Sequence, residues 1–215
     1  MICLTYVEVL TYFLQSRNRA GYEVVAWLGK RLTEAELLRR IREVNIRILI
    51  DEMDNKTLVK EWLAIDTEAK GAVYFGADNR AWVQYRGGKE AIPLLATPFA
   101  ENLDGFLVYI DEAYIYGVDL KFPHDARGVL TLALGQTKDH TVQEDLAAMR
   151  LRQLGTTQSV CFFAPPEVHR SILDVCKKTP GGLVGSSNIN SYHVVNWLLE
   201  QTCRANEQLQ NLYLV

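Results

Sequence analysis

The sequence lacks a long hydrophobic run. A helix that crosses a lipid bilayer needs about 20 mostly apolar residues, and no stretch of this 215-residue chain approaches that length. The N-terminal segment MICLTYVEVLTYFLQ lacks the positively charged start of a signal peptide and carries Glu8. We therefore expect no membrane partner, and we place the protein in the cytoplasm or the nucleus.

Cysteine is also sparse, and the sequence has no excess of positive charge. The four cysteines form no C-x-x-C pair and have no metal-ligand spacing with the four histidines, so we expect reduced thiols and no metal site. The chain has 23 Lys and Arg against 26 Asp and Glu, a net charge of −3, and this balance disfavours a nucleic-acid partner. The one locally basic stretch, Lys30 to Arg47, is typical of a solvated helix face.

Short apolar runs alternate with amphipathic stretches along the chain. The runs predict strands at residues 47–51, 71–75, 81–85, 105–111, 128–134 and 158–164, with 71–75 and 81–85 forming a hairpin. Helices are predicted at residues 6–14, 58–64, 142–154 and 191–214, after the capping box Thr33-x-x-Glu36, and after Pro165-Pro166, with a loop at 181–187.

This alternation predicts an α/β fold with a mainly parallel, three-layer sheet and a long C-terminal helix. We expect the strands at 105–111, 128–134 and 158–164 to be adjacent, because each is apolar on both faces. Residues 1–180 would form the α/β domain, and residues 181–215 a loop and the final helix.

The stretch VYIDEAYIYGVDLKFP, Val108 to Pro123, contains the strongest functional signal. Asp111 and Glu112 end an apolar strand, as the acids that hold Mg²⁺ do in many NTPases. Such acids work beside a phosphate-binding loop of the form G-x-x-x-x-G-K-[S/T], and the sequence contains none. We therefore expect no cofactor in this chain alone, with Mg·ATP bound only if a partner lobe completes the site. The alternative is that the two acids simply end a strand at a sheet edge.

The same stretch resembles the second RecA-like lobe of superfamily-two helicases. Asp111-x-Ala113 followed by Gly117-x-Asp119 is similar to the loop that contacts the ATP ribose there. The resemblance implies that Asp111, Glu112, Gly117 and Asp119 are nucleotide-binding residues of a RecA-like fold.

Those helicases also carry a helix whose arginines reach the γ-phosphate across the cleft. Gln143 leads here to Arg150 and Arg152 on a predicted helix, and an arginine fork suits phosphate oxygens. Because the two arginines lie about 200° apart around a helix, we choose Arg150 as the catalytic residue. The alternative is that both arginines pair with Glu144 and Asp145 at the surface.

Nearly the whole chain resembles one family of very large, mainly fungal proteins built from domains of unknown function and labelled ubiquitinyl hydrolase. The words DEAYIYGVDLKFP, LTLALGQTKDHTVQ, AMRLRQLGTTQSV and VVNWLLEQTCRANEQLQNLYL carry the resemblance. The family pattern has His, Arg and Thr where this chain has Tyr114, Tyr116 and Val118. The resemblance implies a fragment of a thiol-dependent deubiquitinase, with other domains of the same protein and ubiquitin or ubiquitinated proteins as partners.

Two other interpretations stay open. A thiol protease inside the chain needs a cysteine beside a histidine, and Cys161 with His169 is the only short-range pair, although Cys161 lies in a strand that we expect to be buried. A non-enzymatic scaffold that docks other domains would explain the shortage of catalytic groups. The tryptophans Trp27, Trp62, Trp82 and Trp197 are compatible with docking but are more typical of a core.

Overall fold

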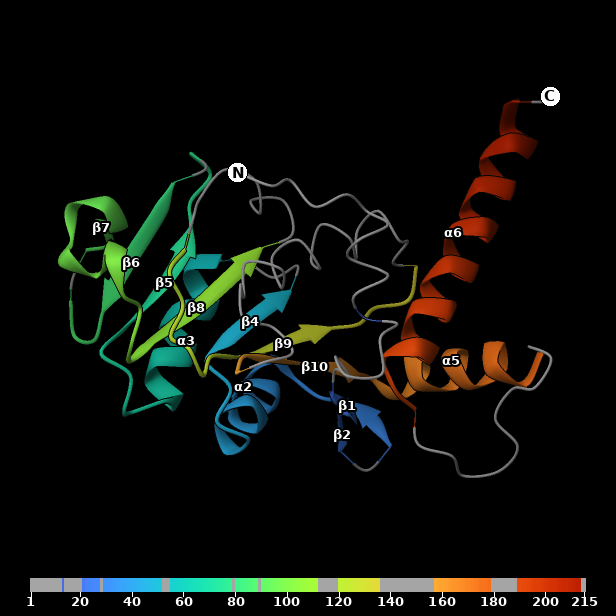
Figure 1. Cartoon of the computed structure of the whole chain (residues 1–215), viewed down its shortest axis with the longest axis horizontal. Coiled ribbons are helices and arrows are strands. Elements are labelled where there is room, and N and C mark those ends of the chain that lie inside the picture. Colours follow the sequence, from blue (N-terminus) through green and yellow to red (C-terminus); the bar gives the residue numbers. More distant parts are fainter. Residues whose placement is uncertain are drawn as a thin grey trace.

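An eight-stranded sheet forms the centre of the protein (Figure 1). The computed structural model describes residues 13, 21–27, 29–51, 55–78, 80–88, 90–111, 120–135, 157–178 and 189–213. The strands of the sheet are β1 (Gly21–Val24), β4 (Ile48–Asp51), β5 (Gly71–Phe75), β6 (Ala81–Tyr85), β7 (Ile92–Pro93), β8 (Phe106–Asp111), β9 (Arg127–Thr131) and β10 (Ser159–Ala164). A separate two-stranded hairpin consists of β2 (Ala26–Trp27) and β3 (Lys30–Arg31).

The strand order is β1-β10-β9-β4-β8-β5-β6-β7. All neighbouring pairs from β1 to β5 are parallel, and β6 and β7 continue the sheet antiparallel. The α/β class, the mainly parallel sheet and the β5–β6 hairpin are therefore confirmed. The predicted adjacency of β8 and β9 is wrong, because β4 lies between them and pairs with both. Only β9 and β10 are direct neighbours among those three strands.

Helices cover both faces of the sheet. The helices α2 (Glu34–Glu43) and α3 (Asn55–Ile65) pack on one face, where Leu49, Tyr109 and Val129 belong to the same buried cluster as Leu38 and Trp62. The helices α5 (Pro166–Lys178) and α6 (Ser191–Tyr213) pack on the other, where the cluster contains Ile50, Ile110, Leu130, Ile172 and Trp197. This alternation along each strand produces the expected three layers.

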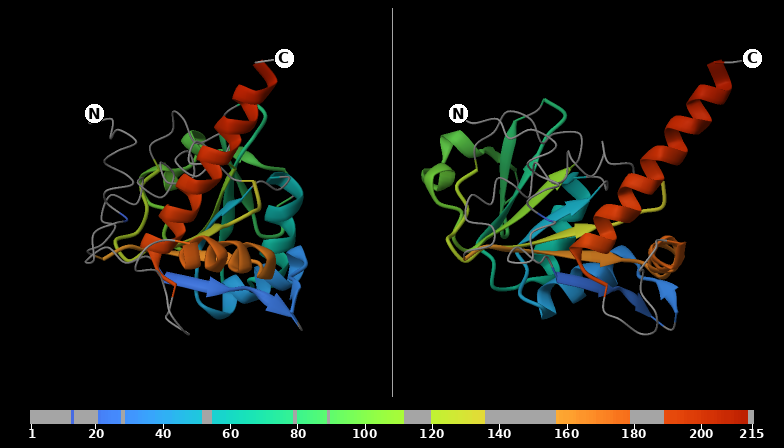
Figure 2. Two further views of the ribbon diagram at one scale, coloured as in Figure 1. Left: turned by 90° about the vertical axis from the view of Figure 1, so that its right-hand side faces the viewer. Right: turned by 45° about the vertical axis from the view of Figure 1, so that its right-hand side comes forward.

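Local sequence signals explain where the helices begin. Thr33 and Glu36 form the predicted capping box at the start of α2, with Thr33 N–H donating to Glu36 Oε2 at 2.8 Å. Pro166 is the first residue of α5, where its missing N–H costs nothing. The predicted long C-terminal helix is α6, which runs away from the sheet beyond its buried first turns (Figure 2).

Several predicted elements lie outside the described residues. These are the loop at 181–187, the helix at 142–154, and the helix at 6–14 apart from Phe13. Two short 3₁₀ helices, η2 (Leu94–Ala96) and η3 (Pro98–Glu101), close the β7 end of the sheet. Of the helices that the structure describes, none has the length and apolar character needed to span a bilayer.

Candidate functional site at the carboxyl edge of the sheet

Two aspartates end neighbouring parallel strands at the same height. Asp51 is the last residue of β4, Asp111 is the last residue of β8, and the two are register partners. The backbones of paired strands lie about 4.8 Å apart. Both strands reach these positions through buried apolar residues, Ile50 and Ile110, which fix the register. The structure thus places the predicted residue Asp111 at a strand end and adds Asp51, which sequence reasoning missed.

This edge contains the point where the chain reverses its direction across the sheet. From β4 the chain passes through α3 toward β5, whereas from β9 it continues toward β10 on the opposite side. In open α/β sheets, ligands bind outside the carboxyl ends of strands at such a switch point, because the departing connections leave a crevice. Asp51 ends β4 and Thr131 ends β9, the two strands that flank this switch point. The Thr131 hydroxyl donates to the Ile50 carbonyl at 3.3 Å.

Two helices begin at the same edge. Helix α3 starts at Asn55, four residues after Asp51, and α5 starts at Pro166, two residues after the end of β10. Helix N-termini attract anions through their free N–H groups and the helix dipole. The first turn of α3 contains no acid, and Lys56 there is exposed. Within the described residues, the start of α3 therefore combines the positive end of the helix dipole with the Lys56 charge.

Lys56 and Thr57 are a second pair that sequence reasoning missed. A lysine followed by a hydroxyl residue opens the helix after a central strand, which is the position of the Lys-Ser/Thr pair in strand–loop–helix phosphate sites. The signal is in the word LIDEMDNKT, but neither glycine of the usual loop is present. The three residues between β4 and α3 lie outside the described part of the chain.

The other predicted site residues cannot be placed. Glu112, Gly117, Asp119 and Arg150 lie outside the described residues, as does Arg152. Their predicted convergence on the carboxyl edge therefore stays a prediction. Within the described part of the chain, no three His, Cys, Asp or Glu residues come together as candidate metal ligands.

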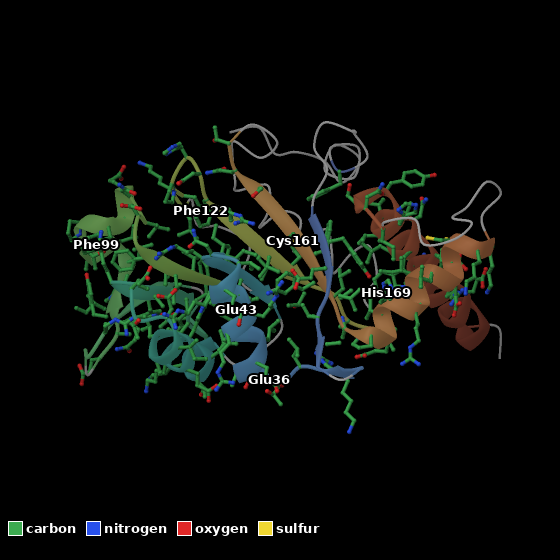
Figure 3. The ribbon with its side chains drawn as sticks, turned by 90° about the horizontal axis from the view of Figure 1, so that it is seen from below. Glu36, Glu43, Phe99, Phe122, Cys161 and His169 are labelled. Carbon is green, nitrogen blue, oxygen red and sulfur yellow. The ribbon has the colours of Figure 1, made fainter. Side chains whose placement is uncertain are left out.

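Cys161 and His169 do not form a catalytic pair. Cys161 packs beside the cluster under α2 and α3, while His169 lies on α5, which covers the opposite face of the sheet (Figure 3). The Nδ1 atom of His169 is 2.9 Å from the Tyr22 hydroxyl. Burial raises the pKa of the Cys161 thiol to about 11. A nucleophilic cysteine needs a lowered pKa, so this half-buried thiol behaves as a small apolar side chain.

The structure also describes the side chains of Cys176, Trp62, Trp82 and Trp197. Trp62 and Trp197 are fully buried, and Cys176 is buried with its pKa raised by desolvation. Trp82 is half-buried and donates its indole N–H to Asp78. Core packing, rather than docking, thus accounts for Trp62 and Trp197.

The basic stretch before β4 is part of a solvated helix, as expected. Arg40 on α2 pairs with Glu23 of β1 at 2.6 Å and with Glu43 at 3.1 Å. Nearby, Arg127 Nη1 donates to the Val44 carbonyl at the end of the same helix. These interactions satisfy the charges locally.

No protein-family model, curated protein or solved structure matches the chain. The geometry of the carboxyl edge is therefore the basis for assigning a function. At this edge the backbone brings Asp51 and Asp111 to the ends of adjacent strands, and α3 begins four residues after Asp51.

Proposed function

We propose that this domain is one lobe of a nucleotide-binding, helicase-like protein and binds the phosphates and cation of a nucleotide at its carboxyl edge. The register pairing of Asp51 with Asp111 carries the proposal. Two carboxylates on neighbouring strands repel each other, and a shared Mg²⁺ removes that repulsion. Mg²⁺ is usually held by one or two carboxylates together with phosphate oxygens.

The phosphates would lie at the start of α3. There the helix N-terminus and the exposed Lys56 both attract negative charge. In such sites the lysine acts as a point charge on the terminal phosphates. Asp111 and Lys56 would therefore bind opposite parts of one Mg·phosphate unit.

The lobe alone forms only part of such a site. A phosphate cradle uses glycines because the backbone must approach the phosphates closely, and the connection from β4 to α3 has no glycine. A partner lobe would supply the missing contacts, and Arg150 would reach the γ-phosphate from this side. The isolated chain therefore binds Mg·ATP only weakly, with a dissociation constant of about 1 mM.

Nuclear magnetic resonance tests this function through the amide signals of the chain titrated with Mg·ATP to about 10 mM, which is above the expected dissociation constant. The proposal expects shifts for Ile50, Lys56 and Leu132 at the carboxyl edge, and none for Asn45 or Asp104 at the amino edge. The variants Lys56→Ala and Asp111→Asn remove the shifts. Lys60→Ala, which lies about one turn further along the same helix, retains them. Absence of shifts, or shifts centred on the amino edge, contradicts the proposal.

A further inference from the structure

The strand β1 forms one edge of the sheet. It pairs with β10 on one side, and no other strand of the described chain pairs with it. The Val25 N–H donates to the Ala164 carbonyl at 2.9 Å, so Val25 directs its main chain toward β10. Because successive residues of a strand direct their main-chain groups to opposite sides, Val24 and Tyr22 direct theirs away from the sheet.

A groove runs beside this edge, between β1 and α2. It has a volume of about 430 Å³, and Val24, Val25 and Leu32 contribute apolar surface to it. Val24 is 39% exposed. The groove therefore offers an apolar contact next to the outward main-chain groups of β1, which pair with no other strand in the described part of the chain.

The charged residues that line the groove carry a small excess of negative charge. The glutamates Glu23, Glu36 and Glu43 line it together with Arg39 and Arg40, which leaves one negative charge in excess. Arg40 is already paired with Glu23 and Glu43. Figure 3 shows Glu36 and Glu43 on α2, beside β1. A ligand with positive charge on either side of an apolar group complements this lining.

The opposite edge of the sheet is different. The strand β7 has only two residues, and one of them is Pro93, which has no N–H to donate. Proline and shortness are two ways in which proteins protect an edge against pairing. The strand β1 contains no proline, and neither of its outward-directed residues, Tyr22 and Val24, is charged.

We propose that β1 and its groove bind an extended peptide segment of another protein by strand addition, with an apolar side chain in the groove and a lysine or arginine on each side of it. Main-chain hydrogen bonds to Tyr22 and Val24 provide affinity, and the groove selects alternate side chains. A second copy of this chain would lack the basic flanks, because β1 itself reads Gly-Tyr-Glu-Val. The proposal does not depend on the nucleotide site, which lies at another part of the molecule.

A fluorescein-labelled peptide, Thr-Lys-Thr-Val-Thr-Lys-Thr, tests the proposal by fluorescence anisotropy with the full chain. The peptide is expected to bind with a dissociation constant of about 100 μM, more weakly at high salt. Two versions N-methylated at complementary alternate residues separate main-chain pairing from side-chain contact. One of the two should lose at least about tenfold in affinity because it cannot donate to β1, while the other keeps most of it. Replacing both lysines by glutamate should weaken binding.

Protein variants give an independent test. Val24→Pro removes an outward N–H and should reduce peptide affinity at least about tenfold, whereas Val24→Thr keeps the N–H and should stay within about twofold. Urea unfolding of both variants separates lost binding from lost folding, and protection of the Val24 amide against hydrogen exchange in the unaltered protein checks the contact directly. Equal binding of both N-methylated peptides, no binding at about 1 mM peptide, or dimerisation of the chain through β1 in light scattering would each overturn the proposal.

Discussion

Asp51 and Asp111 are register partners at the last residues of two adjacent parallel strands. This relationship exists because β4 inserts between β8 and β9. The insertion brings two acids together that are 60 positions apart in the sequence. It also places the start of α3 next to the strand that carries Asp111.

Replacement of Arg86 should destabilise the connection from α3 to β5. Its guanidinium donates to the carbonyl groups of Leu63 at 2.7 Å and Ala69 at 3.0 Å, and also to that of Asp66. Removing the donors leaves these carbonyls to water or unpaired, so we expect Arg86→Ala to lower the free energy of unfolding by about 1–3 kcal/mol.

Urea unfolding monitored by circular dichroism measures this effect. Arg80→Ala is a suitable control, because Arg80 is exposed and forms only a loose ion pair with Asp78 at 3.9 Å. The control should change the free energy of unfolding by less than about 0.5 kcal/mol. Equal stability of Arg86→Ala and the unaltered protein would show that the three carbonyls need no donor.

Acidification should weaken the start of α6 through His193. The Asn190 N–H donates to His193 Nδ1 at 3.1 Å, while Asn190 Oδ1 accepts from Tyr192 N–H, as in a reciprocal helix cap. Desolvation lowers the pKa of His193 below its ordinary value. Stability from this group is therefore present above the unfolded-state pKa of about 6.5 and is lost as the pH falls through the lower folded-state pKa.

His193→Gln provides the matched variant, because glutamine can accept the same hydrogen bond without titrating. Between pH 7.5 and pH 5.5, the free energy of unfolding of the variant should fall less than that of the unaltered protein. His169 contributes a similar decrease in both proteins, because burial lowers its pKa too. Parallel pH profiles for the two proteins would rule out the role of His193.

Cys161 should resist thiol reagents. A thiol with a pKa of about 11 is only about 0.1% thiolate at pH 8, and the side chain is packed beside the core. Cys203 on α6 is exposed. Iodoacetamide at pH 8, followed by peptide mass spectrometry, should modify Cys203 well before Cys161.

A second experiment tests the hypothesis that Cys161 is the nucleophile of a thiol protease. An electrophilic ubiquitin probe should form no adduct with this residue, because the pKa of its thiol is raised and His169 lies over the opposite face of the sheet. Cys161→Ser should therefore react with the probe as the unaltered chain does. An adduct mapped to Cys161 would contradict this conclusion.

Local sequence patterns predicted most of the elements but not their order in the sheet. The apolar runs of β8 and β10 and the capping box of α2 are properties of neighbouring residues, so they can be recognised along the chain. The position of β4 depends on contacts between distant segments, and no local pattern encodes them. The edge strand β1 was missed because its four half-exposed residues lack an apolar pattern.

In the candidate site, too, local sequence predicted one residue, whereas the others depend on contacts between distant segments. Asp111 was predicted because it ends a buried strand. Asp51 ends the predicted strand at residues 47–51, but no local pattern gives it a role, since its importance follows from pairing with Asp111. Lys56 was overlooked because its phosphate-site position depends on α3 following a central strand. In both cases the missing information was tertiary.

Paramagnetic broadening by Mn²⁺ tests the central claim most directly, because Mn²⁺ uses the same oxygen ligands as Mg²⁺. At low Mn²⁺ the amide signals of Ile50, Ile110 and Leu132 should broaden first. Asp51→Asn and Asp111→Asn should each remove this effect, while Asp125→Asn at the amino edge should leave it unchanged. Broadening that persists in both strand-end variants, or that centres on Asp104 and Asp125, would contradict a cation site between β4 and β8.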